Sequence, residues 1–194
     1  MIAGLILAAG ESSRMGRDKA LLEYRGRTFL ETVLAKLFEA GIERRLVVLG
    51  HHAEEVQRAV DLSAVEVVVN RDYARGQTSS LQAGLRALDG PNLEAVVLAL
   101  VDHPAVSAET IGALMRAFKQ SRAPVVIPMF NGQRGHPAVI SRGLFAEILS
   151  LGPGEGANTV IRKYRDTTQF VEVEDAGIML DVDDPESFHR LESA

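Results

Sequence analysis

The chain has 194 residues, 46% of them hydrophobic, which is enough for one globular domain with a substantial buried core. Its formal net charge of −5 argues against general binding to nucleic acid, because such binding draws most of its affinity from basic surfaces. The absence of cysteine excludes disulfides, thiolate metal sites and thiol nucleophiles, so a metal ion would need carboxylates or histidines as ligands. We therefore expect one domain over residues 1–194.

The first apolar run, residues 2–8, predicts a buried strand at the start of the chain. No basic residue precedes this run, and it is too short to cross a bilayer. We therefore expect a soluble, cytoplasmic protein that does not contact membranes.

A glycine-containing loop from Gly10 to Gly16 follows this strand, and Arg14, Arg17 and Lys19 bring positive charge to it. Glycine lets the backbone turn tightly and direct its N–H groups at an anion. The five residues between the two glycines do not fit a P-loop, and no second glycine lies two positions after Gly10, as a dinucleotide fingerprint requires. The loop is predicted to bind polyphosphate in a different way, and a solvated loop with ordinary salt bridges is the alternative.

Strand-length apolar runs recur along the chain, and several are continuous and β-branched, as is typical of strands covered on both faces. Helical patterns alternate with these runs up to about residue 128, which predicts right-handed βαβ units and a largely parallel sheet. The turn over 131–135 leads into 139–140 and predicts an antiparallel hairpin or a lid. The predicted strands are 2–8, 46–49, 65–69, 95–101, 125–127, 138–140 and 169–173. The predicted helices are the one that begins with a capping box at Thr28 and ends at Gly41, then 54–60, 80–88, 108–120, 142–150, 159–164 and 186–191.

Ligands of open parallel sheets bind beyond the carboxyl ends of the strands, and the glycine loop and Asp102 both fall there. A carboxylate that directly follows a buried strand suits Mg²⁺, which prefers oxygen ligands shared with phosphate groups. Asp181 and Asp183 point to one face if residues 178–183 are extended, so either one can complete a metal site. The alternatives are an Asp102 that caps the next helix and a solvated acidic turn at 181–184.

Two polar segments are candidates for binding substrates. Thr78, Ser79 and Ser80 open a predicted helix, where hydroxyl groups read a nucleobase edge or bind an anion, although helix capping explains them equally well. Arg134 and His136 lie in the loop after residue 131 and are positioned to approach a second substrate. A structural role for His136 is the leading alternative.

The residues from Leu7 to Lys19 read Leu-Ala-Ala-Gly-Glu-Ser-Ser-Arg-Met-Gly-Arg-Asp-Lys. This stretch closely resembles the signature of the MobA-like NTP transferases, in particular the molybdenum cofactor cytidylyltransferases. Further segments occur in the family's order at 76–85, 102–104, 134–137 and 181–186. The resemblance implies an α/β fold of the Rossmann-like three-layer sandwich type with a mostly parallel sheet. It also implies a Mg²⁺-dependent nucleotidyltransferase that joins an NTP to a phosphorylated small-molecule acceptor and releases pyrophosphate.

With this resemblance, the candidate residues acquire expected roles. Catalysis is assigned to Lys19, Arg14 and Asp102, and Mg²⁺ is assigned to Asp102 together with Asp183 or Asp181. Acceptor binding is assigned to Arg134 and His136. The residues assigned to the nucleotide are Leu7, Ala8, Ala9, Gly10, Glu11, Ser12, Ser13, Arg14, Lys19, Thr78, Ser79 and Ser80.

The resemblance also bears on the two substrates. Family members that use GTP usually read Leu-Ala-Gly-Gly, whereas cytidylyltransferases read Leu-Ala-Ala-Gly, as this chain does. A methyl group at Ala9 narrows the pocket against a purine, so CTP is the expected nucleotide and another NTP the alternative. Molybdopterin or molybdenum cofactor is the expected acceptor, and a molybdoenzyme is a further expected partner. Three departures affect the acceptor more than the nucleotide: His103 stands where the family has Gln, and Gly154 and Asn158 replace the Asp and Arg of cytidylyltransferases.

Two other functions stay open at this point. Sugar-1-phosphate and polyol-phosphate nucleotidylyltransferases share a Gly-rich loop with Arg and Lys, but they usually insert residues before the lysine. A nucleotide-binding chaperone that matures a molybdoenzyme without catalysis is the more distant alternative.

Overall fold

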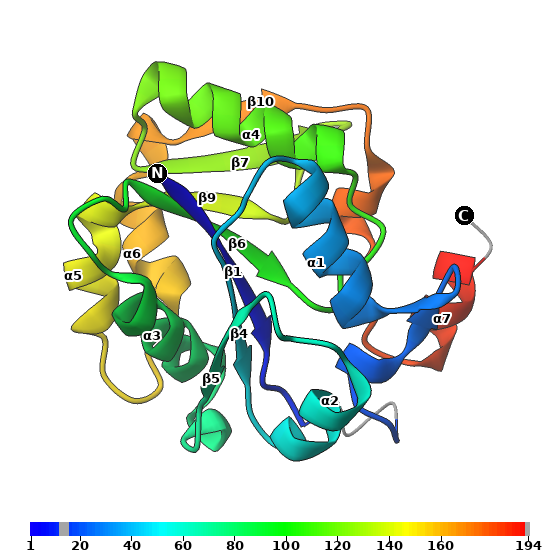
Figure 1. Cartoon of the computed structure of the whole chain (residues 1–194). Helices are drawn as coiled ribbons and strands as arrows, with labels where there is room; N and C mark the ends of the chain where they lie inside the picture. Colours follow the sequence, from blue (N-terminus) through cyan, green and yellow to red (C-terminus); the bar gives the residue numbers. More distant parts are fainter. Residues whose placement is uncertain (12–15, 193–194) are drawn as a thin grey trace.

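In the computed structural model, which describes residues 1–11 and 16–192, a central sheet lies between two layers of helices (Figure 1). The sheet has eight strands in the described part of the chain, in the order β10-β7-β9-β6-β1-β4-β5, with β8 paired to β7. β9 is antiparallel to both of its neighbours, and the other pairs along this order are parallel. The strands are β1 (Ile2–Ala8), β4 (Arg45–Leu49), β5 (Glu66–Val69), β6 (Ala95–Leu100), β7 (Val125–Phe130), β8 (Gln133–Arg134), β9 (Ala138–Ser141) and β10 (Gln169–Glu172). A separate hairpin pairs β2 (Glu23–Tyr24) with β3 (Arg27–Thr28).

The centre of the sheet is buried on both faces because its strands are apolar at every position rather than at alternate ones. In β1, Ile6 and Ala8 belong to the hydrophobic cluster on one face, while Leu5 and Leu7 belong to the cluster on the other. This division follows from the period of two along a strand, and it produces the three-layer arrangement.

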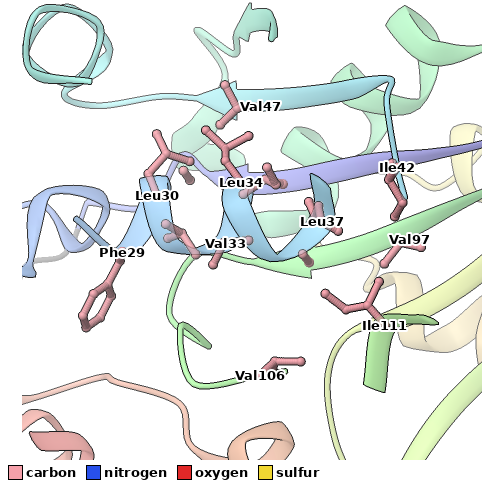
Figure 2. Close-up of a cluster of buried hydrophobic side chains, with 14 of the residues drawn as sticks. Phe29, Leu30, Val33, Leu34, Leu37, Ile42, Val47, Val97, Val106 and Ile111 are labelled. Atoms are coloured by element: carbon pink, nitrogen blue, oxygen red, sulfur yellow. The ribbon is translucent and has the colours of Figure 1, made fainter. Parts of the chain in front are cut away.

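The first face is covered by α1 (Phe29–Glu39) and α4 (Ala108–Ser121). Thr28 caps α1 in a capping box, since it accepts a hydrogen bond from the Glu31 N–H while the Glu31 side chain accepts one from the Thr28 N–H. Leu30, Leu34 and Leu37 then line one side of the helix and pack on the sheet (Figure 2). Burial of each such side chain contributes roughly 1.5–3 kcal/mol.

The second face is covered by α3 (Gln77–Leu88), α5 (Phe145–Leu149) and α6 (Ala157–Lys163). Two shorter helices, α2 (Ala53–Ala59) and α7 (Pro185–Glu192), complete the α-helices of the described chain. The 3₁₀ helices are η1 (Lys19–Leu21), η2 (Tyr73–Arg75), η3 (Arg142–Leu144), η4 (Arg165–Thr167) and η5 (Ala176–Met179). None of the helices formed by residues 1–11 and 16–192 is both long and apolar enough to cross a membrane.

The predicted α/β class, the mostly parallel sheet and all seven predicted strands are confirmed. The first strand has the predicted bounds, and the other six differ at one end by one to three residues. The predicted helix 142–150 is divided into η3 and α5, and the predicted helix 80–88 begins three residues earlier, at Gln77. The turn after residue 130 forms a hairpin between β7 and β8, as expected.

Candidate active site

A cavity of about 290 Å³ opens at the carboxyl ends of β1 and β6, where ligands of parallel sheets bind. Its lining combines residues from these two strand ends, from η1, from the amino end of α3 and from the segment before α7. The lining residues are Leu7, Ala8, Ala9, Gly10, Glu11, Asp18, Lys19, Tyr73, Gly76, Gln77, Ser80, Leu100, Val101, Asp102 and Asp183.

Lys19 lies at the centre of the charged groups in this cavity. Its Nζ is 3.3 Å from Oδ2 of Asp102 and 2.5 Å from Oδ1 of Asp183. The three side chains are 14%, 23% and 39% exposed, respectively, so the ion pairs are only partly screened by solvent. Asp18 fixes the direction of Lys19, since its carboxylate caps η1 by accepting a hydrogen bond of 2.8 Å from the Ala20 N–H. Burial raises the pKa of Asp18.

Asp183 reaches the cavity because backbone hydrogen bonds connect the segment before it to the residues that follow β6 and to those that precede β9. The Val182 N–H donates to the Asp102 carbonyl at 3.0 Å, and the Val182 side chain is fully buried. The His136 N–H donates to the carbonyl of Ile178 at 3.1 Å. This contact requires a glycine at 135, since a Cβ there would lie 2.3 Å from the Ile178 carbonyl oxygen. Two elements far apart in sequence thus hold the second carboxylate next to the first.

The pair of carboxylates suits a divalent cation that arrives with phosphate ligands. Oδ1 of Asp102 is buried and has no hydrogen-bond partner among the described residues, which leaves its coordinating capacity unused. Within residues 1–11 and 16–192, no group of three or more His, Asp or Glu side chains is arranged to hold a metal ion. Mg²⁺ is commonly bound by one or two carboxylates plus phosphate oxygens and water, so this donor set fits it.

A pair of buried imidazoles lies next to Asp102. The ring centroids of His103 and His136 are 5.2 Å apart, and His103 Nε2 is 3.9 Å from Asp102 Oδ1. Burial lowers the pKa of both imidazoles, that of His136 to about 4, although Asp102 and Asp181 oppose this effect. Nδ1 of each histidine is buried and has no partner among the described residues. Both imidazoles are therefore neutral at physiological pH.

The opposite side of the cavity is formed by the amino end of α3. Gly76 adopts a φ of +96° just before this helix, a conformation that favours glycine. The Asn70 amide donates to the hydroxyls of Ser79 and Ser80 at 2.9 and 3.0 Å, and Ser79 donates back to the carbonyls of Asp72 and Gly76. Of the three hydroxyl residues predicted to bind the nucleotide, Ser80 lines the cavity of the described chain, whereas Thr78 and Ser79 do not.

Most other predicted nucleotide and metal residues are brought together. Leu7 through Glu11, Lys19, Asp102 and Asp183 share the cavity, while Asp181 is close to the histidine pair instead. Ser12, Ser13 and Arg14 lie outside the described residues. The two residues assigned to the acceptor separate: His136 is next to His103, and the Arg134 guanidinium lies 4.7 Å from the ring centroid of Phe170 on β10.

The lining residues that the sequence did not identify are Asp18, Tyr73, Gly76, Gln77, Leu100 and Val101. Gly76 could have been found, because a glycine before a helical pattern is a common signal for a helix start. Tyr73 carries no such signal. It reaches the cavity because Gly50 leaves room: a Cβ at Gly50 would lie 2.9 Å from the Cβ of Tyr73 and 2.3 Å from the Ala9 carbonyl oxygen.

The fold and the position of this cavity define a class of α/β proteins that bind nucleotides at the carboxyl ends of parallel strands. The family model of the MobA-like NTP transferase domain matches residues 4–168. The chain belongs to this family and is a nucleotidyltransferase, as the resemblance implied.

Individual relatives span nearly the whole chain. It is 34% identical to nicotine blue oxidoreductase of Paenarthrobacter nicotinovorans, covering 98% of this chain and 96% of that protein. It is 28% identical to the molybdenum cofactor cytidylyltransferase of Escherichia coli K12, covering 95% and 92%. The crystal structure of Rv0371c from Mycobacterium tuberculosis H37Rv superposes with a TM-score of 0.88 at 30% identity, covering 100% and 98%, and a structure of that protein contains manganese. A divalent metal is thus consistent with the family.

Proposed function

We propose that this protein transfers CMP from Mg²⁺-bound CTP to a phosphorylated acceptor of the molybdopterin or molybdenum cofactor type and releases pyrophosphate. The observation that carries the proposal is the convergence of Lys19, Asp102 and Asp183 in one cavity beside the first strand. The proposal treats residues 1–194 as one domain, because Asp183 near the end of the chain contacts Lys19 near its beginning. It places this domain in the cytoplasm.

The protein's part in this reaction is positioning and charge stabilisation. The backbone of residues 9–13 and the Arg14 side chain are proposed to bind the β- and γ-phosphates, as the family resemblance implies, and residues 12–14 lie outside the described part of the chain. Lys19 neutralises charge that develops at the α-phosphate during in-line attack by the acceptor phosphate. Asp102 and Asp183 would hold Mg²⁺, which supplies further charge stabilisation to the phosphates when it is bound. An ionised acceptor phosphate needs no general base, so the proposal assigns no proton-transfer role to the two nearby histidines.

The space beside Ala9 supports the choice of CTP. The Ala9 side chain is buried where β1 ends, and Gly50 and Tyr73 pack against it. A methyl group at this position reduces the width available to a base between β1 and the amino end of α3. A purine needs more width than a pyrimidine, so a glycine at this position would suit GTP better.

The acceptor is proposed to bind on the side of Asp102 that faces His136. That side is formed by the loop between β8 and β9, which lies at the same edge of the sheet as the nucleotide cavity. Arg134 is exposed at the same loop, where its guanidinium can attract a phosphorylated molecule.

A radiochemical assay tests the proposal. The protein is incubated with Mg²⁺, each α-labelled NTP and molybdopterin or molybdenum cofactor, and labelled product and pyrophosphate are measured. We expect CTP to give the highest rate and Lys19→Ala to lower it by roughly 10²–10³, as for loss of one electrostatic stabiliser. Lys119→Ala, which removes the same charge from an exposed position on α4, is the matched control. Nucleotide binding without pyrophosphate release would favour the chaperone, and a sugar-1-phosphate as the better acceptor would favour the sugar nucleotidylyltransferases.

One observation favours a second candidate function, a reduction. The relative named nicotine blue oxidoreductase shares 34% identity over nearly the full length of both chains. A pyrophosphate-bearing reductant such as NADH would place its anionic group at Lys19 of the same cavity. Oxidation of NADH in the presence of nicotine blue, measured spectrophotometrically without any NTP, distinguishes this function from nucleotidyl transfer.

A further inference from the structure

The ammonium group of Lys19 occupies the space that the two carboxylates would offer to a metal ion. Its Nζ contacts Oδ2 of Asp102 at 3.3 Å and Oδ1 of Asp183 at 2.5 Å. The two carboxylate oxygens are therefore no farther apart than two hydrogen-bond lengths. Mg²⁺ binds oxygen at about 2.1 Å, so an ion shared by both carboxylates would lie between these two oxygens, and the ammonium group and the ion compete for the same oxygens.

The same three groups are also required for the proposed reaction, but in different pairs. There, Lys19 pairs with phosphate oxygens, while Asp102 and Asp183 face the metal ion. A divalent ion and an ammonium group at this distance repel each other strongly when solvent screening is limited. The contacts of Lys19 with both carboxylates therefore oppose a divalent ion bound between them.

We propose that Lys19 couples the binding of metal and nucleotide: without nucleotide its ammonium group neutralises Asp102 and Asp183 and opposes a divalent cation, and the triphosphate draws it away and opens the metal site. This inference rests on the proposed function for the identity of the nucleotide. Lys19 thereby acts as an internal competitor of the metal ion, in addition to its contact with phosphate. Linkage requires the effect to be reciprocal, so a bound metal ion also makes Lys19 available to phosphate.

Measurement of Mn²⁺ binding without nucleotide tests the coupling directly. Free Mn²⁺ is titrated by electron paramagnetic resonance in the wild type, in Lys19→Met and in Lys19→Gln. We expect both substitutions to tighten Mn²⁺ binding by at least about fivefold, the lower end of typical coupling between sites. Most substitutions of an active-site lysine only weaken ligand binding, so a gain in affinity is a distinctive result.

Two control variants test whether the gain in Mn²⁺ affinity arises at the pair of carboxylates. Lys119→Met removes the same charge from an exposed position on α4, and its Mn²⁺ affinity should equal that of the wild type. In the double variant Lys19→Met, Asp183→Asn, the gained affinity should be lost, since one carboxylate of the pair is neutral. Thermal unfolding of each variant shows whether it is folded, and Lys19→Gln retains a hydrogen-bond donor toward the carboxylates if Lys19→Met is unstable.

The outcomes separate this inference from the proposed function. If folded Lys19→Met and Lys19→Gln bind Mn²⁺ no more tightly than the wild type does, the coupling role is wrong even if the wild type transfers CMP. An equal gain in Lys119→Met would also contradict it, because the effect would then be one of overall charge. If the variants gain affinity but the wild type transfers no nucleotide, the coupling stands and the CMP-transfer function is wrong.

Discussion

Gly50 does not line the cavity, but its replacement by alanine should distort the side of the cavity where the nucleotide is proposed to bind. Gly50 follows β4, and an added Cβ would lie 2.3 Å from the Ala9 carbonyl oxygen and 2.9 Å from the Cβ of both Ala9 and Tyr73. Its φ is outside the left-handed region, so steric contact is the source of the cost. Because the Ala9 carbonyl belongs to the backbone, it cannot rotate away as a side chain could, so the end of β1 or of β4 has to move.

Overpacking of this kind costs typically 1–3 kcal/mol, so we expect a loss of about 2 kcal/mol in the free energy of unfolding. For a chain of this size that corresponds to a Tm lower by roughly 4–8 °C. A shift of about 1 Å in the backbone around residues 9–11 should also weaken triphosphate binding, since such displacements cost up to about 10² in well-aligned sites.

Thermal unfolding followed by circular dichroism, with and without CTP and Mg²⁺, measures both effects. Gly143→Ala is the matched control, because the new Cβ would lie 3.7 Å from Ser141 Oγ, an ordinary van der Waals contact. We expect Gly143→Ala to unfold within about 2 °C of the wild type, as surface substitutions usually do. A Gly50→Ala protein with wild-type Tm and an undiminished CTP-induced shift would refute the steric reasoning.

Three further predictions concern Asp102, His136 and Ala9. Asp102→Asn should lower the rate of nucleotidyl transfer by roughly 10²–10³ in the radiochemical assay, and near-normal turnover would remove Asp102 from the metal site. Burial lowers the pKa of the His136 imidazole from 6.5 to about 4. Between pH 6.5 and pH 4 this imidazole is therefore protonated in the unfolded chain but neutral in the folded protein, so the free energy of unfolding falls as the pH is lowered through this range. Urea unfolding should therefore show a loss of about 3 kcal/mol over this range that His136→Gln largely lacks, and no contribution from His136 above pH 6.5. Ala9→Gly should lower the preference for CTP over GTP by about tenfold, measured as the ratio of kcat/KM values, and an unchanged ratio would contradict the role of the methyl group.

The sheet and much of the site could be predicted from sequence because they depend on local signals. Continuous β-branched runs identify strands buried on both faces, and the carboxyl ends of β1 and β6 then bring Lys19 and Asp102 to one edge. The contributions of Tyr73 and of the histidine pair could not be predicted. They depend on close packing between distant segments, at Gly50 against Ala9 and at the loop before β9 against η5, and one sequence contains no direct record of such distances.

The choice between Asp181 and Asp183 illustrates the same limit. Alternation along an extended segment placed both carboxylates on one face, but residues 181–183 form no strand in the structure. Two backbone donors hold this segment: the Val182 N–H donates to the Asp102 carbonyl, and the Asp183 N–H donates to Ser187 Oγ. In this arrangement Asp183 contacts Lys19, and Asp181 is close to the imidazoles.

The late position of Asp183 in the chain has a consequence for biosynthesis. The family-model match ends at residue 168, and both Asp183 and the edge strand β10 come after it. A ribosome therefore delivers Lys19 and Asp102 long before Asp183, and the proposed site lacks its second carboxylate until this last stretch has packed against the residues that follow β6.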